Sequence, residues 1–129
     1  MNRLVNPEGL PGPIGFSHAV ETEGSRTLYL AGQIGETGDG HIADDLVGQF
    51  RQALRNVAAC LEEAGFPIES VVRMEIYTTD VAAYRENLKE LGIAYREVFG
   101  RHYPAMALFG VTELFDPRAL VEVVATASL

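Results

Sequence analysis

The sequence has 129 residues, of which 47% are hydrophobic and 22% are charged, a composition typical of one globular domain over residues 1–129 rather than a disordered or fibrous chain. Its formal net charge of −8 at pH 7 argues against nucleic acid or an anionic membrane as partner, and no stretch approaches the roughly 18 apolar residues of a membrane span. The single cysteine, Cys60, excludes an intramolecular disulfide. Pro7 and Gly9 interrupt the apolar core that a signal peptide would need. We therefore expect a protein of the reducing cytoplasm.

The N-terminal part predicts an irregular lead-in followed by a hairpin. Residues 7–15 contain three prolines and three glycines, so we expect residues 1–13 to be irregular and the ordered fold to begin at Phe16. Residues 16–21 and 27–34 are strand-like, and the segment between them has the length and glycine content of a hairpin turn. These two segments are therefore predicted to pair with each other.

A long amphipathic helix is predicted over residues 44–64. Its apolar residues recur at intervals of three and four, which places them on one face. Asp44 or Asp45 can cap the start of this helix, and Gly65 can end it.

A strand with two different faces is predicted over residues 70–78. Alternation places Val72, Met74 and Ile76 on one face, and Val71, Arg73, Glu75 and Tyr77 on the other.

The C-terminal part predicts a second helix and two further strands. Asp80 can cap a helix that continues to about Gly100. Gly92 lies inside that helix at a cost of roughly 1 kcal/mol relative to Ala, so it either permits close packing or marks a functional gap. Residues 105–111 and 119–127 are strand-like and are separated by a turn.

This order of elements predicts an α+β fold, in which two helices pack on one face of a mixed sheet. The opposite face then carries Arg73, Glu75, Tyr77 and Glu122 among apolar residues. Such a mixture suits association with other subunits better than exposure to water, so we expect a symmetric oligomer.

Motifs along nearly the whole chain resemble the RidA/YjgF family, also called the Rid or reactive-intermediate-deaminase family. The matching segments are residues 15–20, 28–35, 53–57, 64–65, 104–105 and 120–123, together with Gln49, Tyr95 and Phe99. The resemblance implies a chorismate-mutase-like fold and a homotrimer whose sheets line a central barrel, with small-molecule pockets at the subunit interfaces.

The resemblance also implies an activity, because the best-studied branch of the family hydrolyses enamines and imines to a keto acid and ammonia. In that branch an arginine binds the substrate carboxylate directly after a Pro-Ala pair. Here the pair is followed by Met106. Losing a charge-assisted hydrogen bond of about 1.5 to 3 kcal/mol should weaken the binding of a 2-imino acid by about tenfold or more.

Other expected pocket positions depart from the family pattern as well. Phe16 replaces a tyrosine, Ala31 a serine, Gly92 an asparagine and Leu108 a cysteine. The substrate-binding residues carried over are Phe16, Ser17, Ala31, Gly32, Gln33, Gly92, Met106 and Leu108. A pocket with this lining is apolar, so its ligand is expected to be less charged than a 2-imino acid.

Among the polar pocket residues that the resemblance implies, Glu122 is the one that this sequence keeps. It is the expected catalytic residue. In the functional interpretation it is a general base that orients or deprotonates water. In the structural interpretation it pairs with Arg73 or Arg26 at the subunit seam. Arg118 or Arg73 could also replace the missing pocket cation.

Two functions remain open: hydrolysis of an imine, enamine or related electrophile, and non-catalytic binding of a small metabolite by a trimer. Some family members have been described as ribonucleases, but the charge of −8 makes RNA a poor partner. His18, His41 and His102 lack metal-ligand spacing, so no metal or cofactor is expected.

Overall fold

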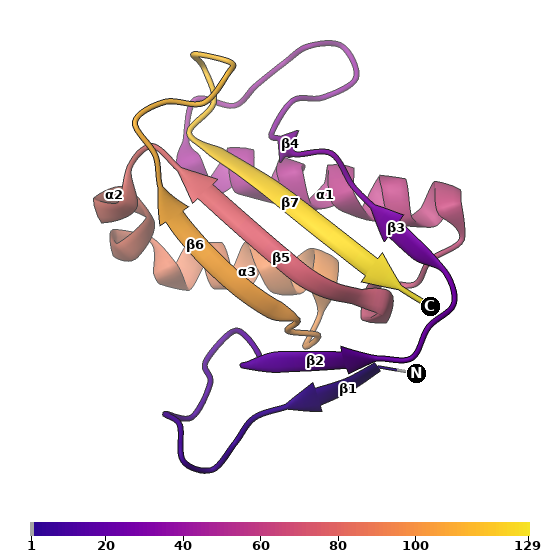
Figure 1. The fold of residues 1–129 in the computed structure, drawn as a ribbon. Helices are drawn as coiled ribbons and strands as arrows, with labels where there is room; N and C mark the ends of the chain where they lie inside the picture. Colours follow the sequence, from indigo (N-terminus) through magenta and orange to yellow (C-terminus); the bar gives the residue numbers. More distant parts are fainter. Residues whose placement is uncertain (1) are drawn as a thin grey trace.

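The computed structural model describes residues 2–129, which form a five-stranded mixed sheet covered on one face by helices, with a two-stranded sheet beside it (Figure 1). The elements in chain order are β1 (Asn2–Val5), β2 (Ala19–Thr22), β3 (Thr27–Tyr29), β4 (Gln33–Ile34), α1 (Leu46–Ala64), a 3-10 turn (Ile68–Ser70), β5 (Val71–Thr78), α2 (Val81–Glu86), α3 (Leu88–Phe99), β6 (Ala105–Gly110) and β7 (Val121–Ser128). The predicted α+β class is confirmed. No helix within residues 2–129 is long and apolar enough to cross a membrane.

The main sheet is built around β5. This strand pairs in parallel with β6 and antiparallel with β7, and both β3 and β4 pair with β7. A parallel pair needs a crossover connection, which α2 and α3 provide behind the sheet (Figure 1).

Helix α1 confirms the predicted central helix and distinguishes between its two candidate caps. The Asp45 carboxylate accepts a hydrogen bond of 2.9 Å from the backbone N–H of Gly48. Gly65 ends the helix in the left-handed conformation at φ 76°, which favours glycine because it has no Cβ. The buried face of α1 includes Phe50, Leu54 and Leu61.

The prediction of an irregular N-terminus over residues 1–13 is wrong at its start. Residues Asn2–Val5 form β1, which pairs antiparallel with β2 through Leu4 opposite Val20. The sequence gives little sign of this strand, because it is only 4 residues long and its partner lies beyond the proline-rich segment.

The predicted hairpin between residues 16–21 and 27–34 is also wrong. Strand β2 pairs with β1, whereas β3 pairs with β7 through Tyr29 opposite Thr126. Gly24 does not form a tight turn but passes close to the chain end: a Cβ there would lie 2.8 Å from the backbone nitrogen of Leu129. Arg26 and Leu129 then exchange backbone hydrogen bonds of 3.0 and 2.9 Å.

The second predicted helix is interrupted at Asn87, so three helices rather than two cover the sheet. The Asn87 side-chain amide donates a hydrogen bond of 2.8 Å to the carbonyl oxygen of Ala83. The Asn87 backbone adopts φ −113° and ψ 22°, which ends α2 and starts α3. A side chain that competes for helical carbonyl groups interrupts the regular pattern without a proline.

A bulge in β5 changes one face assignment from the simple alternation. The register of β5 against β7 shifts between Val71 and Arg73, and such an extra residue turns the following side chains over. Val71 therefore lies in the core with Met74, while Val72 is half-buried. The face away from the helices carries Arg73, Glu75 and Tyr77, as predicted from their spacing.

Candidate functional site

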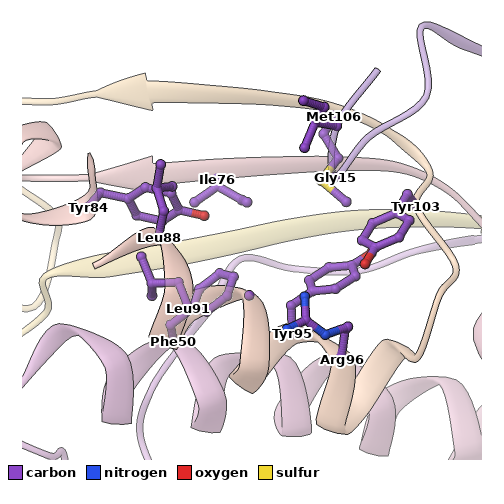
Figure 2. A pocket seen from close by; sticks show the side chains of 12 residues that line it. Gly15, Phe50, Ile76, Tyr84, Leu88, Leu91, Tyr95, Arg96, Tyr103 and Met106 are labelled. Atoms are coloured by element: carbon purple, nitrogen blue, oxygen red, sulfur yellow. The ribbon is translucent and has the colours of Figure 1, made fainter. Parts of the chain in front are cut away.

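An apolar hollow lies between the β5–β6 edge of the sheet and helices α2 and α3 (Figure 2). It has a volume of about 410 Å³. Its lining is Ile14, Gly15, Phe50, Ile76, Tyr84, Leu88, Leu91, Gly92, Tyr95, Arg96, Tyr103 and Met106. Aliphatic and aromatic side chains dominate this cavity, as in most small-molecule sites.

A second hollow of about 230 Å³ adjoins the first. The two share Gly15, Ile76, Tyr84 and Met106, and the second adds Phe16, Ala107 and Leu108. Phe16, Gly92, Met106 and Leu108, all predicted substrate-binding positions, therefore lie around one connected cavity. We call this the helix-side cavity.

The polar groups of the helix-side cavity come mainly from tyrosines. Burial raises the pKa of Tyr84 to about 12 and also raises the pKa of Tyr95, so both phenols are neutral at physiological pH. The Tyr95 hydroxyl donates a hydrogen bond of 2.6 Å to the carbonyl oxygen of His102, and its ring stacks on that of Tyr103 at 5.2 Å. Tyr95 is thus held in place by its partners and forms a fixed wall.

Ser17 is one of the predicted substrate-binding residues. In the structure its hydroxyl is hydrogen-bonded to the backbone of Tyr103. Ser17 is 3% exposed, and its hydroxyl donates a hydrogen bond of 2.7 Å to the carbonyl oxygen of Tyr103. Its backbone N–H donates to Pro104 at 3.0 Å. These bonds fix the chain next to β6 and thereby position Phe16 at the cavity.

Of the remaining predicted site residues, Gly32 lies against Glu122 on β7, and Ala31 and Gln33 adjoin Gly32 in the sequence. Glu122 is half-buried and lies against Gly32: a Cβ on Gly32 would be 2.8 Å from the Glu122 carboxyl carbon. Gln33 pairs with Val123 in the sheet, and its side-chain amide donates to the carbonyl oxygen of Ala31 at 3.2 Å. We call this group the Glu122 cluster.

The helix-side cavity and the Glu122 cluster lie on opposite faces of the sheet. Met106 is opposite Met74, a buried residue of the helix-covered face. Glu122 is opposite Tyr77, which belongs to the other face. Since β5 also separates β6 from β7, one chain does not bring Met106 and Glu122 together.

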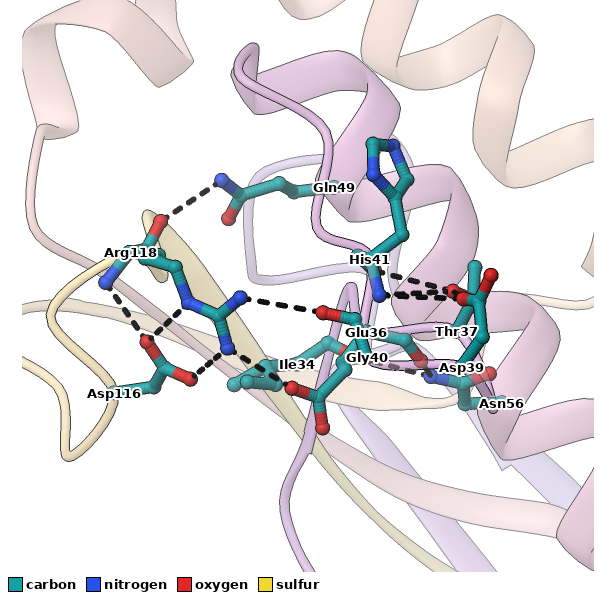
Figure 3. A network of polar contacts seen from close by, with 10 residues as sticks. All are labelled: Ile34, Glu36, Thr37, Asp39, Gly40, His41, Gln49, Asn56, Asp116 and Arg118. Carbon is teal, nitrogen blue, oxygen red and sulfur yellow. Dashed lines mark hydrogen bonds and ion pairs between the residues drawn. The ribbon is translucent and has the colours of Figure 1, made fainter.

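Arg118 and Arg73, the candidates to replace the missing pocket arginine, form ion pairs with other residues of the chain. Arg118 forms ion pairs of 2.8 Å with Asp116 and 3.1 Å with Glu36 (Figure 3), and its guanidinium holds the pKa of Asp116 below the usual value. Arg73 lies 3.9 Å from Glu75.

Arg26 likewise has a local partner, because its guanidinium carbon lies 4.6 Å from the centre of the Phe66 ring. Arg118 therefore joins the loop after β4 to the loop before β7. Neither Arg26 nor Arg73 forms an ion pair with Glu122 within the chain.

Gln49 fixes the end of the sheet from which Glu122 projects. It is 1% exposed, and its side-chain amide donates to the carbonyl oxygens of Ala43 at 2.8 Å and Arg118 at 3.0 Å (Figure 3). Its side-chain oxygen accepts a hydrogen bond of 2.7 Å from the N–H of Leu120. Gln49 thus connects α1 to the segment that begins β7.

The sequence analysis did not identify Tyr84 and Arg96 as cavity residues. Tyr84 lies on α2 and lines the cavity together with Leu88 and Leu91 of α3. The signal that points to Arg96 is its position four residues after Gly92, one helical turn along the same face.

The chain is similar in sequence to proteins of one family. Residues 11–129 match the sequence model of a family described as endoribonuclease L-PSP. A RutC family protein of Aquifex aeolicus is 35% identical, over 97% of this chain and 98% of its own. The 2-iminobutanoate/2-iminopropanoate deaminase of Homo sapiens is 29% identical, over 88% of this chain and 81% of its own.

Solved structures show the same similarity. A protein of unknown function of the conserved Rid protein family, YyfB from Yersinia pestis, has a TM-score of 0.90 at 34% identity, over 99% of this chain and 98% of its own. The YjgF gene product of E. coli has a TM-score of 0.69 at 24% identity, over 98% of both chains, which shows a shared fold.

Proposed function

The chain belongs to the RidA/YjgF family, and we propose that it hydrolyses a small imine or enamine to a carbonyl compound and ammonia. The observation that carries this proposal is the position of Glu122. Its carboxylate lies over Gly32 on the helix-free face of the sheet, and the ion pairs found among residues 2–129 do not include it. An acid placed in this way is available to a water molecule.

The chemistry requires one water molecule and a base. The imine reacts as its protonated iminium form: Glu122 accepts a proton from the water as the water oxygen bonds to the iminium carbon, whose π electron pair moves to the nitrogen, which gives a neutral carbinolamine. Glu122 then returns its proton to the nitrogen. The carbon–nitrogen bond breaks and ammonia leaves as the carbonyl forms, and the proton of the carbinolamine hydroxyl passes to Glu122 and from there to the solvent. An enamine enters the same sequence after a proton is added to its carbon.

We further propose that the active unit is a homotrimer with each pocket at a subunit interface. The separation of Met106 from Glu122 by the sheet favours this arrangement, because a second copy can bring its Glu122 cluster to the helix-side cavity. The helix-free face also exposes aromatic surface, with Tyr29 80% and Phe109 45% exposed. Sedimentation of the protein tests this assembly, and a monomer would contradict it.

The substrate is not bound by the arrangement that the family resemblance implies. Met106 occupies the position expected for a carboxylate-binding arginine and is part of an apolar wall. A thioether cannot replace the paired donors of a guanidinium. We therefore propose an activity that differs in specificity from that of the standard 2-imino-acid deaminases.

The test is ammonia release from freshly generated 2-iminobutanoate and from a neutral aliphatic imine, each measured against buffer. The wild type should accelerate release from at least one of them, and Glu122→Gln should lose the acceleration. Glu63→Gln is a matched control, because Glu63 is exposed on α1. Rates equal to buffer with both substrates, or full activity of Glu122→Gln, contradict the proposal.

A second candidate is a non-catalytic metabolite-binding protein. It is favoured by the lining of the helix-side cavity, which contains no carboxylate within residues 2–129. A ligand at a hundred times its dissociation constant should add about 2.7 kcal/mol to the free energy of unfolding. Thermal stabilisation by a metabolite that is not consumed supports this candidate.

A further inference from the structure

Arg96 lies at the helix-side cavity next to Gly92. Both residues line the cavity and are one turn apart on α3, and Figure 2 shows Arg96 beside Tyr95 at its rim. Side chains on a helix lean toward its N-terminus, so Arg96 extends over the turn that contains Gly92. A Cβ on Gly92 would lie 3.2 Å from the Arg96 Nη1 atom. The missing side chain at position 92 therefore leaves the space that the guanidinium occupies.

The ion pairs found among residues 2–129 do not include Arg96, and Glu97, its neighbour on α3, pairs with Arg51. The residues three and four positions away are Gly92, Ile93, Phe99 and Gly100, which carry no charge. Since the described cavity lining also lacks a carboxylate, an anion entering the cavity meets no competing acid there.

The arrangement of the walls gives the orientation of a ligand. Arg96 is exposed, whereas Phe50 and Leu91 are buried deep in the lining. A ligand with one charged end would therefore place that end at the opening and its apolar part inside. Arg96 presents paired N–H donors that match the two oxygens of a carboxylate.

We propose that Arg96 binds the carboxylate of a small amphipathic ligand whose apolar part fills the helix-side cavity, and that the absence of a Cβ at Gly92 leaves room for the guanidinium in this position. The cation that the sheet lacks at Met106 is thus provided by α3. This inference rests on the proposed function only in taking the cavity as the substrate pocket, and it specifies that the substrate is a carboxylic acid.

Binding of benzoate and benzamide, measured by calorimetry on the intact protein, tests the proposal. The two probes have nearly the same shape but differ in charge. The wild type should prefer benzoate, and Arg96→Met should weaken benzoate binding by about tenfold while leaving benzamide unchanged. Arg96→Lys should retain part of the preference. Raising the salt concentration should weaken benzoate binding in the wild type more than in Arg96→Met.

Two further variants distinguish the effect of where the Arg96 guanidinium lies from the effect of the net charge of the protein. Gly92→Ala should reduce benzoate binding by displacing the guanidinium. Arg85→Met removes an exposed arginine from α2, outside the cavity lining, and should bind benzoate as the wild type does. Equal benzoate affinity in wild type and Arg96→Met, or no preference of the wild type for benzoate over benzamide, overturns the inference.

The outcome is distinct from that of the activity test. Charge-selective binding that depends on Arg96, without ammonia release, upholds the ligand assignment and contradicts hydrolysis. Ammonia release that depends on Glu122 but not on Arg96 upholds hydrolysis and contradicts the ligand assignment.

Discussion

The carboxyl group of Glu122 lies directly over the backbone of Gly32, where a Cβ would approach the Glu122 carboxyl carbon to 2.8 Å and its Cγ to 3.1 Å. The backbone of Gly32 does not have a positive φ, so this close approach is the reason that a side chain is excluded. The position of the Glu122 carboxylate on β7 therefore depends on Gly32, which directly precedes β4.

Gly32→Ala should displace the Glu122 carboxylate without unfolding the chain, because the half-buried side chain can rotate away. Since misplacing a reacting group by about 1 Å can cost about a hundredfold in rate, we expect ammonia release to fall at least about tenfold. Gly38→Ala is the control, because nothing lies within 4 Å of a Cβ there. Unchanged activity of Gly32→Ala would show that this contact does not position the acid.

Asp45→Ala should lower the free energy of unfolding by about 1 kcal/mol, because it removes the N-cap of α1. Asp44 has the same charge and is adjacent in the sequence, but the bond to Gly48 comes from Asp45. Asp44→Ala should therefore change stability by less than about 0.5 kcal/mol. Urea unfolding of both variants at one protein concentration measures the difference, and equal losses would contradict the assignment.

Gln49→Leu should lower the free energy of unfolding by about 3 kcal/mol, because it removes three hydrogen bonds of a buried side chain to backbone groups of Ala43, Arg118 and Leu120. Gln52→Leu is the matched control on α1, since the Gln52 amide bonds to the Asn56 side chain. Chemical denaturation compares the two variants. A loss in Gln49→Leu no larger than in Gln52→Leu would be inconsistent with this role.

Tyr84→Phe should reduce the loss of stability at alkaline pH. Burial raises the pKa of Tyr84 to about 12, above the value near 10 of an unfolded chain. Below about pH 10 the phenol is neutral in both states, whereas between about pH 10 and about pH 12 the unfolded chain ionises first and the free energy of unfolding falls.

The full shift in the pKa of Tyr84 corresponds to roughly 3 kcal/mol. Urea unfolding between about pH 9 and about pH 12 should show a shallower decline in Tyr84→Phe than in the wild type. A decline equally steep in Tyr84→Phe would indicate that the phenol ionises alike in both states.

The sequence predicted elements whose signals are local. Helix α1 has its apolar stripe, Asp45 and Gly65 within one continuous segment, so its bounds could be read from neighbouring residues. The pairing of β3 could not, because its partner β7 lies at the other end of the chain. Local turn signals favoured a hairpin that this long-range pairing excludes.

The candidate site was predictable only in part. The resemblance located Phe16, Gly92, Met106 and Leu108, which do line one cavity. The strand pattern placed Glu122 on the face away from the helices, as the structure has it, but the resemblance grouped it in one pocket with Met106, which lies on the other face. Arg96 was missed because a charged residue on a helix is ordinarily assigned to solvent.

Helix α2 has consequences for how the cavity opens. It has 6 residues and ends at the Asn87 break, and it packs against the hydrophobic core mainly through the partly buried Ala83 and Tyr84. Its backbone amides should therefore take up deuterium from heavy water sooner than those of α1. A molecule seated against Tyr84 would slow that uptake, which makes α2 a natural reporter of occupancy.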